Sequence, residues 1–324
     1  MLSSSEIKSK ARALGFDACG IAPVGAFAEL GFLEQWIDRG YAGDMGYLRR
    51  SARQRADVRN VVPSAKSVIV TATLYNVDRP YSTECADRQR AQIARYAWGE
   101  DYHAVIEARL EELLAWMRRV SPEPFEARRY VDTGPVQERV YAQHAGIGWT
   151  GKNTCVINPE LGSWLFLGEI ISSLSLDPDP PSPDQCGTCA LCLEACPTEA
   201  LRAPGVLDAT RCISYLTIEL RGSIPNGLRG SVGAHIFGCD VCQEVCPWNL
   251  DAPVSSDPNW RPRPVWDMKR IVELSRMSDD ELGAALRGSA MRRAKIDGLR
   301  RNLAVALENT FVEDVQKTVR ALSS

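Results

Sequence analysis

The chain has 324 residues, a 45% share of hydrophobic residues and a formal net charge of −3. This length corresponds to about two domains, and the hydrophobic share is sufficient for buried cores. The slight acidity, with a pI near 5.8, excludes a protein that coats nucleic acid or an anionic membrane with its whole surface. Because the sequence shows neither a signal-like apolar stretch near Met1 nor a run of about 18 apolar residues, we expect no membrane span and a cytoplasmic location.

The first half of the chain predicts a mixture of helices and strands. Ser3 to Ser5 followed by Glu6 is typical of a capped helix, which Gly15 ends. Strands are predicted at 68–74, 155–157 and 164–171, and apolar residues at helical spacing predict a helix at 103–120. Residues 1–177 should therefore form one mixed α/β domain.

Two further segments follow this domain. Asp177 to Pro183, which reads DPDPPSP, interrupts regular structure and serves as a linker. Residues 178–250 hold most of the cysteines, and residues 251–324 begin with a Pro- and Trp-rich connector and continue as an Arg-rich helical segment from about Met268. The predicted fold class is α+β.

The spacing of the cysteines indicates iron–sulfur clusters. Cys186-x2-Cys189-x2-Cys192-x3-Cys196-Pro197 is the bacterial ferredoxin run that binds four-iron, four-sulfur clusters. A partial second copy consists of Cys212, standing apart, and Cys239-x2-Cys242-x3-Cys246-Pro247. Eight cysteines thus supply the ligands of two [4Fe-4S] clusters in a bacterial-ferredoxin-like domain.

In such runs the cysteine before the proline binds the neighbouring cluster, because the short spacings let only the other three thiolates converge. We therefore predict crossed ligation. The first cluster takes Cys186, Cys189, Cys192 and Cys246, and the second takes Cys196, Cys212, Cys239 and Cys242.

Two structural zinc sites are the alternative, since zinc also binds four cysteines. Zinc ribbons pair two separated Cys-x2-Cys knuckles, however, and do not need a four-cysteine run that ends in proline. The three scattered cysteines, Cys19, Cys85 and Cys155, are expected to be small core residues.

Two polar, Gly-rich stretches, 131–135 and 146–154, are expected to be loops at strand ends where backbone approaches a ligand. Asp132 follows the apolar Tyr130 and Val131, so partial desolvation should let it hold a proton and act as a general acid. The alternative is a turn residue that caps the Thr-Gly-Pro bend. Neither stretch matches a dinucleotide-binding or Walker motif.

Taken together, these motifs resemble the epoxyqueuosine reductases. The resemblance covers nearly the whole chain and rests on RYAWGEDYH, VDTGPVQER, GIGWTGKNT, the doubled ferredoxin motif with GCDVCQEVCPWN, and RRAKIDGLRRN. It implies an enzyme that uses cobalamin and two [4Fe-4S] clusters to reduce the epoxide of epoxyqueuosine to queuosine at the wobble position of the tRNA anticodon loop.

The resemblance also implies roles for single residues. Asp132 matches the proposed proton donor that faces the cobalt of a base-off cobalamin, which has no protein ligand to cobalt. Residues 1–177 would then be the cobalamin-binding catalytic domain. The implied cobalamin contacts are Arg55, Ala94, Asp132, Arg139, Lys152, Asn153, Val156, Ser214, Cys239 and Asp240.

The expected partner is the tRNA anticodon stem-loop that carries epoxyqueuosine. Its phosphates should meet the C-terminal segment 251–324, for which we name Arg292, Arg293, Lys295 and Arg301. A solvated helix face is the alternative for this charge run. We further expect a monomer that receives electrons from a flavodoxin or ferredoxin system.

Two other functions remain open from the sequence. A reductive dehalogenase shares cobalamin and paired clusters but normally carries a twin-arginine export signal, which this sequence does not show. A ferredoxin-like electron-transfer protein would keep the clusters without an active site of its own.

Overall fold

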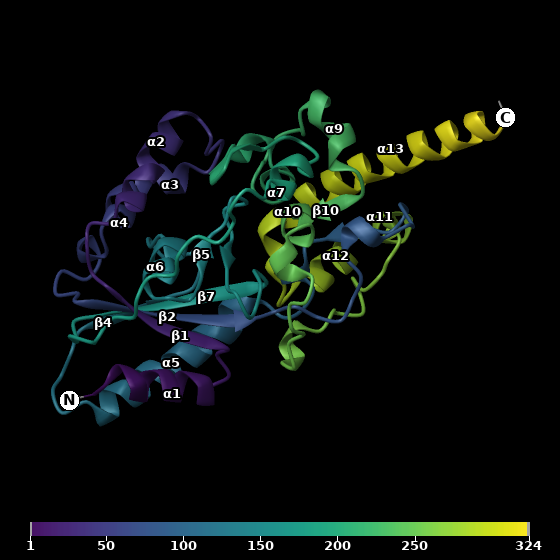
Figure 1. Cartoon of the computed structure of the whole chain (residues 1–324). Coiled ribbons are helices and arrows are strands. Elements are labelled where there is room, and N and C mark those ends of the chain that lie inside the picture. The colour runs from purple at the N-terminus through teal and green to yellow at the C-terminus, as the bar shows by residue number, and fades with distance from the viewer. Residues whose placement is uncertain (1, 323–324) are drawn as a thin grey trace.

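The computed structural model describes residues 2–322, with side chains through residue 311. It has the predicted α+β architecture, in which a four-stranded sheet with helices on both faces lies beside a cysteine-bearing segment and a C-terminal group of helices (Figure 1). The N-terminus lies at the far end of the sheet domain, and the last helix extends away on the opposite side of the molecule (Figure 1).

The sheet is entirely antiparallel, in the order β1-β2-β7-β4. Its strands are β1 (Ala18–Pro23), β2 (Ser67–Leu74), β7 (Leu165–Ser172) and β4 (Ala127–Tyr130). Every residue of β2 is buried, because this central strand is covered on both faces, and Ser67 pairs with Ser172 while Leu74 pairs with Leu165. The predicted strands at 68–74 and 164–171 are confirmed.

Helices α1 (Ser4–Ala13) and α5 (Tyr102–Val120) cover one face of the sheet, and α6 (Glu138–His144) covers the other (Figure 1). The Ser3 hydroxyl and the Glu6 carboxylate form the predicted capping box at the start of α1. Asp101 caps α5 by accepting a hydrogen bond from the His103 N–H. Both predicted helices are confirmed.

Short elements fill the spaces between these layers. The predicted strand at 155–157 is shorter, since only β6 (Val156–Ile157) pairs, with β5 (Trp149–Thr150). Residues 173–190 contain no helix or strand, as the proline-rich linker predicts. The remaining short elements before and within the cysteine segment are α2 (Phe32–Asp38), α3 (Gly46–Arg50), α4 (Ala52–Ala56), α7 (Leu191–Glu194), β8 (Leu201–Ala203), β9 (Val206–Leu207), α8 (Ile213–Ile218), α9 (Asn226–Val232) and α10 (Val241–Glu244).

The C-terminal segment is helical, as predicted, with α11 (Ile271–Arg276), α12 (Asp279–Leu286) and α13 (Lys295–Leu322). Its core includes residues from the first half of the chain, because β3 (Gln92–Ile93) pairs in parallel with β10 (His235–Phe237). Asn302 of α13 is fully buried and donates to the carbonyls of Thr217 and Ile236 at 2.7 and 2.8 Å. This side chain ties α13 to both α8 and β10.

Replacing Asn302 by alanine should destabilise the protein by about 1–3 kcal/mol, because two buried carbonyls lose their donors. Urea denaturation of the variant and wild type measures the difference. Asn60→Ala is the matched control, since Asn60 is exposed and its side-chain amide donates to one carbonyl, that of Arg53; its effect should stay within about 0.5 kcal/mol. Equal losses in the two variants would contradict this account of α13.

Candidate active site

The cysteine segment folds as two similar loops. In each loop a Cys-x2-Cys pair leads into a short helix, α7 or α10, and a Cys-Pro step follows. The two helices pack against each other. N–H groups also point at sulfur: the Trp149 indole donates to Cys186 Sγ at 3.4 Å, and the Ala200 amide donates to Cys196 Sγ at 3.3 Å. Such donors favour a negatively charged sulfur.

The thiols influence one another in two groups. Burial, followed by the charges of Cys246, Cys186 and Cys189, raises the pKa of Cys192 to about 11. Burial also raises the pKa of Cys242, and Cys155, Cys239 and Cys212 add to the effect. Burial raises the pKa of Cys212, and Cys196 adds to it. These effects link Cys246 to cysteines of the first motif, and Cys196 and Cys212 to the second.

The second Gly-rich loop joins the sheet domain to both cysteine loops. Lys152 Nζ donates to the carbonyls of Gly187 and Cys189 at 2.6 and 2.8 Å, and Asn153 Nδ2 donates to the carbonyl of Cys242 at 3.1 Å. Gly148 is required here, since a Cβ at this position would lie 2.3 Å from the Ile157 carbonyl oxygen. The loop therefore fixes the positions of the cysteine loops against β6.

A cavity of about 320 Å³ lies between the sheet domain and the second cysteine loop. Its walls combine apolar side chains of β6 and β7 with residues of α8 and the loop that precedes α10. Seven of the ten residues expected to contact cobalamin line it: Ala94, Arg139, Asn153, Val156, Ser214, Cys239 and Asp240.

The other three residues of that set lie outside the cavity lining. Lys152 lies against the first cysteine loop, as described above, and Arg55 donates to the Val136 carbonyl at 2.7 Å. Asp132 lies on the turn after β4, and its carboxylate is close enough to Arg139 of the cavity wall for that guanidinium to lower its pKa. Asp132 is therefore near Arg139 of the cavity wall without being part of the lining.

One buried residue of this region was missed in the sequence. Arg95 is 3% exposed, its backbone N–H donates to Asp240 Oδ2 at 2.5 Å, and its guanidinium lies over the rings of Tyr81, Trp98 and Trp164. Burial raises the pKa of Asp240 to about 7. The signal for this role in the sequence is the run of aromatic residues around Arg95, in the motif RYAWGEDYH, and Tyr96 of this run lines the cavity.

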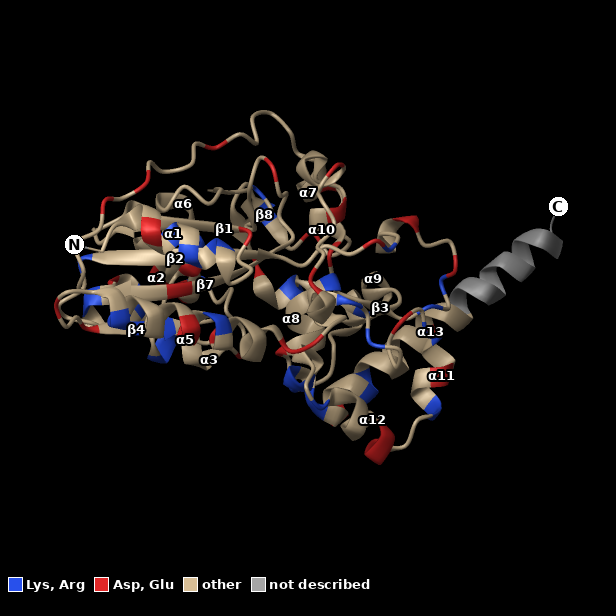
Figure 2. Cartoon of the chain, turned by 90° about the horizontal axis from the view of Figure 1, so that it is seen from below, with Lys and Arg blue, Asp and Glu red and all other residues tan. Residues whose placement is uncertain are grey.

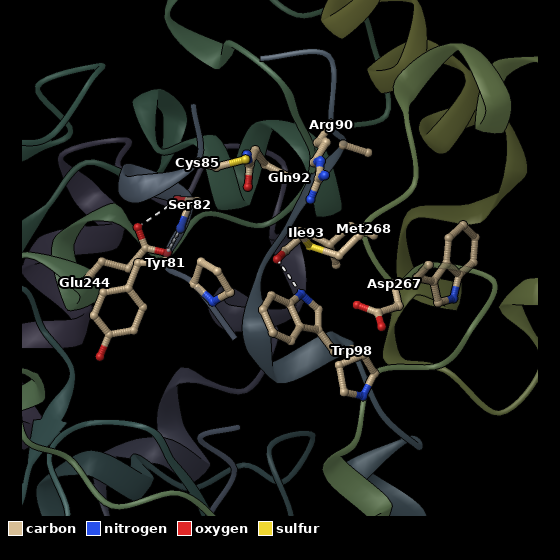
Figure 3. Close-up of a pocket in the computed structure, with 14 residues that line it drawn as sticks. Tyr81, Ser82, Cys85, Arg90, Gln92, Ile93, Trp98, Glu244, Asp267 and Met268 are labelled. Carbon is tan, nitrogen blue, oxygen red and sulfur yellow. Dashed lines mark hydrogen bonds between the residues drawn. The ribbon is translucent and has the colours of Figure 1, made fainter. Parts of the chain in front are cut away.

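The scattered cysteines are not all core residues. Cys19 packs against the main core, but Cys155 lines the large cavity and Cys85 lines a smaller one. That smaller cavity, of about 60 Å³, shares no lining residue with the large one and contains none of the predicted site residues (Figure 3). Its polar contacts are internal: Ser82 donates to Glu244, and the Trp98 indole donates to the Ile93 carbonyl (Figure 3).

Asp132, His103 and Asp101 form a row of hydrogen-bonded polar groups, with Asp132 at one end. His103 Nε2 lies 3.2 Å from Asp132 Oδ2, and His103 Nδ1 lies 2.7 Å from Asp101 Oδ1. The Tyr102 ring stacks on the His103 ring, with centroids 4.1 Å apart. His103 thus has a carboxylate at each ring nitrogen, which favours the doubly protonated imidazolium.

The direction of the Asp132 pKa differs from the sequence argument. Burial lowers the pKa of His103, but the hydrogen bonds and charges of Asp101 and Asp132 outweigh burial and raise it to about 9. For Asp132, burial raises the pKa, but the hydrogen bond and charge of His103 outweigh it and lower the pKa. The effect of desolvation on the Asp132 pKa is therefore outweighed by His103, and in this arrangement the proton resides on His103.

Basic side chains lie near Asp132. Arg293 makes two 2.8 Å contacts with Glu219 and lies 5.5 Å from the Tyr47 ring, and Asp132 contributes to the raised pKa of Tyr47. Arg292, which is exposed, helps to lower the pKa of Asp101. Lysine and arginine segments gather beside α8 in Figure 2.

Two of the four predicted phosphate contacts need comment. Lys295 is exposed and has a φ of 61°. Arg301 uses its guanidinium inside the protein, where it donates to the carbonyls of Leu216, Leu220 and Gly222 and to the side chain of Asn302. These five donations occupy all five N–H groups of Arg301, so it has none left for a phosphate.

No helix in the described part of the chain is long and apolar enough to cross a membrane.

Two segments of the chain match known protein families. Residues 185–249 match the family model described as "4Fe-4S double cluster binding domain", and residues 55–133 match "Epoxyqueuosine reductase QueG, DUF1730". The cysteine segment is therefore a 4Fe-4S cluster-binding domain, attached to an α/β domain, as in an iron–sulfur oxidoreductase.

Relatives extend the match over the chain. The epoxyqueuosine reductase of Gloeobacter violaceus is 44% identical over 313 residues, which cover 94% of this chain and 95% of the relative. That of Pseudomonas aeruginosa is 40% identical over 310 residues, covering 94% and 85%. A crystal structure of epoxyqueuosine reductase with a tRNA-Tyr epoxyqueuosine-modified tRNA stem loop has a TM-score of 0.83 and 31% identity, covering 94% of this chain and 80% of that chain.

The chain belongs to the epoxyqueuosine reductase family, and it is an oxidoreductase. These relatives do not support a reductive dehalogenase or an electron carrier without an active site of its own.

The raised pKa of His103 can be tested by nuclear magnetic resonance of protein with labelled histidines, of which the chain has three. We expect the His103 ring to titrate near pH 9, and to titrate at lower pH in Asp132→Asn because one facing negative charge is lost. His235, whose pKa is lowered by burial, is the internal control. A His103 midpoint that does not move in the variant would contradict the pairing.

Proposed function

We propose that this protein reduces the epoxide of epoxyqueuosine to queuosine at the wobble position of a tRNA anticodon loop, with cobalamin and two [4Fe-4S] clusters. The observation that carries the proposal is that one cavity is lined both by the second cysteine loop and by Arg139, whose guanidinium is near enough to Asp132 to help lower its pKa. Asp132 in turn pairs with His103. An electron source and a proton source thus meet at one site.

The eight motif cysteines fit two clusters with crossed ligation. The mutual pKa effects join Cys246 to the first motif and Cys196 to the second, which supports the predicted exchange of ligands between the two loops. Because α7 and α10 are in contact, the two clusters would be neighbours. A small electron-transfer protein such as a flavodoxin or ferredoxin would reduce them, with the enzyme acting as a cytoplasmic monomer.

The large cavity fits a cobalamin in its chemistry. It offers apolar walls from Val156, Leu165 and Leu167 for a flat macrocycle, and the polar groups of Arg139, Asn153 and Ser214 for its amide side chains. All three histidines lie among the described residues and none lines the cavity, so a base-off cobalamin bound there would have no histidine ligand to cobalt. When bound, cobalamin supplies a centre that collects single electrons and delivers reducing power to carbon.

The residues of this chain supply one proton. Conversion of an epoxide to an alkene consumes two electrons and two protons and releases the oxygen as water. His103 holds one of these protons at neutral pH, and Asp132, whose side chain is 58% exposed, is the more exposed group of the pair. Asp132 would pass this proton to the departing oxygen, and Asp101 would keep the imidazole oriented. The second proton would come from water.

The RNA partner is supported by the related enzyme solved with an epoxyqueuosine-modified tRNA stem loop. In this chain, Arg292, Arg293 and Lys295 are exposed and can meet phosphates, and Arg292 and Arg293 lie near Asp101 and Asp132. Helix α3 meets this basic region, because the Arg293 guanidinium lies over the ring of Tyr47 in α3. Arg50 of α3 and Arg53 of α4 are exposed and add positive charge to these helices. We leave Arg301 out of this interface.

Asp132→Asn should retain iron, sulfide and cobalamin but lose turnover, because a carboxamide does not donate a comparable proton. Nucleoside mass spectrometry of an epoxyqueuosine stem-loop after incubation with reduced enzyme measures the product. The control is Asp177→Asn, an exposed carboxylate in the linker, which should keep normal turnover. Normal queuosine formation by Asp132→Asn would refute the proton-transfer role.

Replacing Arg292 and Arg293 together by alanine should weaken binding of the stem-loop and reduce its salt dependence by about 0.7 log units per lost phosphate contact. Fluorescence anisotropy at several salt concentrations gives the slope. The matched control replaces Arg118 and Arg119, an exposed pair at the other end of α5, about 22 Å along the helix from His103. An unchanged slope in the Arg292, Arg293 variant would exclude these phosphate contacts.

A further inference from the structure

The turn that carries Asp132 is strained. Asp132 has a φ of 56°, and the Thr133 N–H donates to the Val131 carbonyl at 2.5 Å, which makes Asp132 the centre of a γ-turn of the rare positive-φ kind. The turn also folds back on β4, since a Cβ at Gly134 would lie 2.4 Å from the Tyr130 ring. Such a conformation persists only where the surroundings hold it.

Glu138 is one group that holds it. Its Oε1 accepts a hydrogen bond from the Asp132 backbone N–H at 2.5 Å. Because Glu138 is the first residue of α6, this bond ties the strained turn to a helix that packs on the sheet. The bond acts on the backbone of Asp132 and leaves its carboxylate free for His103.

Beneath Glu138 lies a carboxyl group that the proposed reaction does not use. Glu169 is 0% exposed at the centre of the sheet, where it pairs with Val70 of β2 and Tyr130 of β4. Its neighbour Gly168 faces α5, so Glu169 faces α6 on the other side. There its carboxyl group contacts the carboxyl group of Glu138.

This contact requires a proton. Neither oxygen of Glu169 receives a hydrogen bond from an N–H or hydroxyl donor among the described residues. A buried carboxyl group without such a donor is stabilised only if it, or the carboxyl group it touches, is protonated. Two ionised carboxylates in contact away from water would instead repel each other, as in dyads where one proton is shared.

We propose that Glu138 and Glu169 share one proton and act as a positioning pair, which holds the Asp132 turn in the geometry needed for proton transfer. The inference rests on the proposed function for the role of Asp132 and adds the groups that place it. Glu169 is fixed in the sheet and shares the proton with Glu138, and Glu138 accepts a hydrogen bond from the Asp132 backbone N–H. Neither glutamate contacts the substrate. Loss of the proton would push Glu138 away from Glu169 and release the turn.

The charged and titratable groups that face the pair are Asp132, Arg139 and Tyr102, while His103 faces Asp132. Burial raises the pKa of Glu169 well above its usual value, and Glu138 raises it further; burial and the charge of Asp132 also raise the pKa of Glu138. A raised pKa means that the shared proton is present at low pH and is lost as pH rises through that value. Support for the turn therefore weakens on the alkaline side.

The test compares Glu138→Gln and Glu138→Leu in the enzyme loaded with both cofactors. Leucine removes the acceptor for the Asp132 N–H, so kcat should fall roughly 10²-fold with little change in KM, as for a misplaced catalytic group. Glutamine keeps an acceptor for Asp132 and a permanent donor for Glu169, so it should restore most of kcat. It should also abolish the alkaline decline that arises from the pair, while the decline from His103 near pH 9 remains.

Two measurements do not depend on turnover. Infrared spectra should show the C=O stretch of a buried protonated carboxyl group in the wild type and lose it in Glu169→Gln. Hydrogen exchange of residues 131–136 should quicken in Glu138→Leu but not in Glu138→Gln, with Glu34→Gln, an exposed residue of α2, as the control.

Equal kcat values in Glu138→Leu and Glu138→Gln, or an absent carboxyl band, would overturn the positioning pair. If the wild type showed the band and the exchange pattern but no epoxide reduction, the proposed function would fail while the coupling of the pair to the turn would stand.

Discussion

Two adjacent side chains, Lys152 and Asn153, connect the sheet domain to the two cysteine loops through backbone carbonyls. The rest of the site depends on this connection. A cysteine loop that binds a cluster has little apolar core of its own, so its position must be set from outside. With both loops held against β6, the space left beside β7 becomes the cavity, which is lined by Cys239 and Asp240 of the second cysteine loop and by Val156 and Arg139 of the sheet domain.

The site separates two kinds of charge by their surroundings. Thiols and Asp240 occur on the buried side of the cavity, where burial raises their pKa values and N–H donors or an iron cluster must compensate for negative charge. On the exposed side, His103 is positive between two carboxylates. This arrangement suits a reaction in which electrons arrive from the protein interior and protons arrive from the solvent side.

Buried polar residues connect this chemistry to the fold. Arg95 satisfies the carbonyls of the segment 77–80 and lies against three aromatic rings, so the wall of the cavity near Asp240 is rigid. Asn302 and Arg301 do the same for α13, which packs on α8 and β10. An arginine in a basic run is thus not necessarily an arginine available to RNA.

The sequence by itself determined the capped helices, the buried central strands, the α+β class and the cluster motif, because each depends on neighbouring residues or on short fixed spacings. It also placed seven residues that line one cavity, through motifs of the family. Only the tertiary structure decided which way the pKa of Asp132 moves, that Arg301 is used internally, and that Glu169 lies under Glu138. Each of these depends on side chains that are brought together from distant segments, and local sequence carries no information about such neighbours.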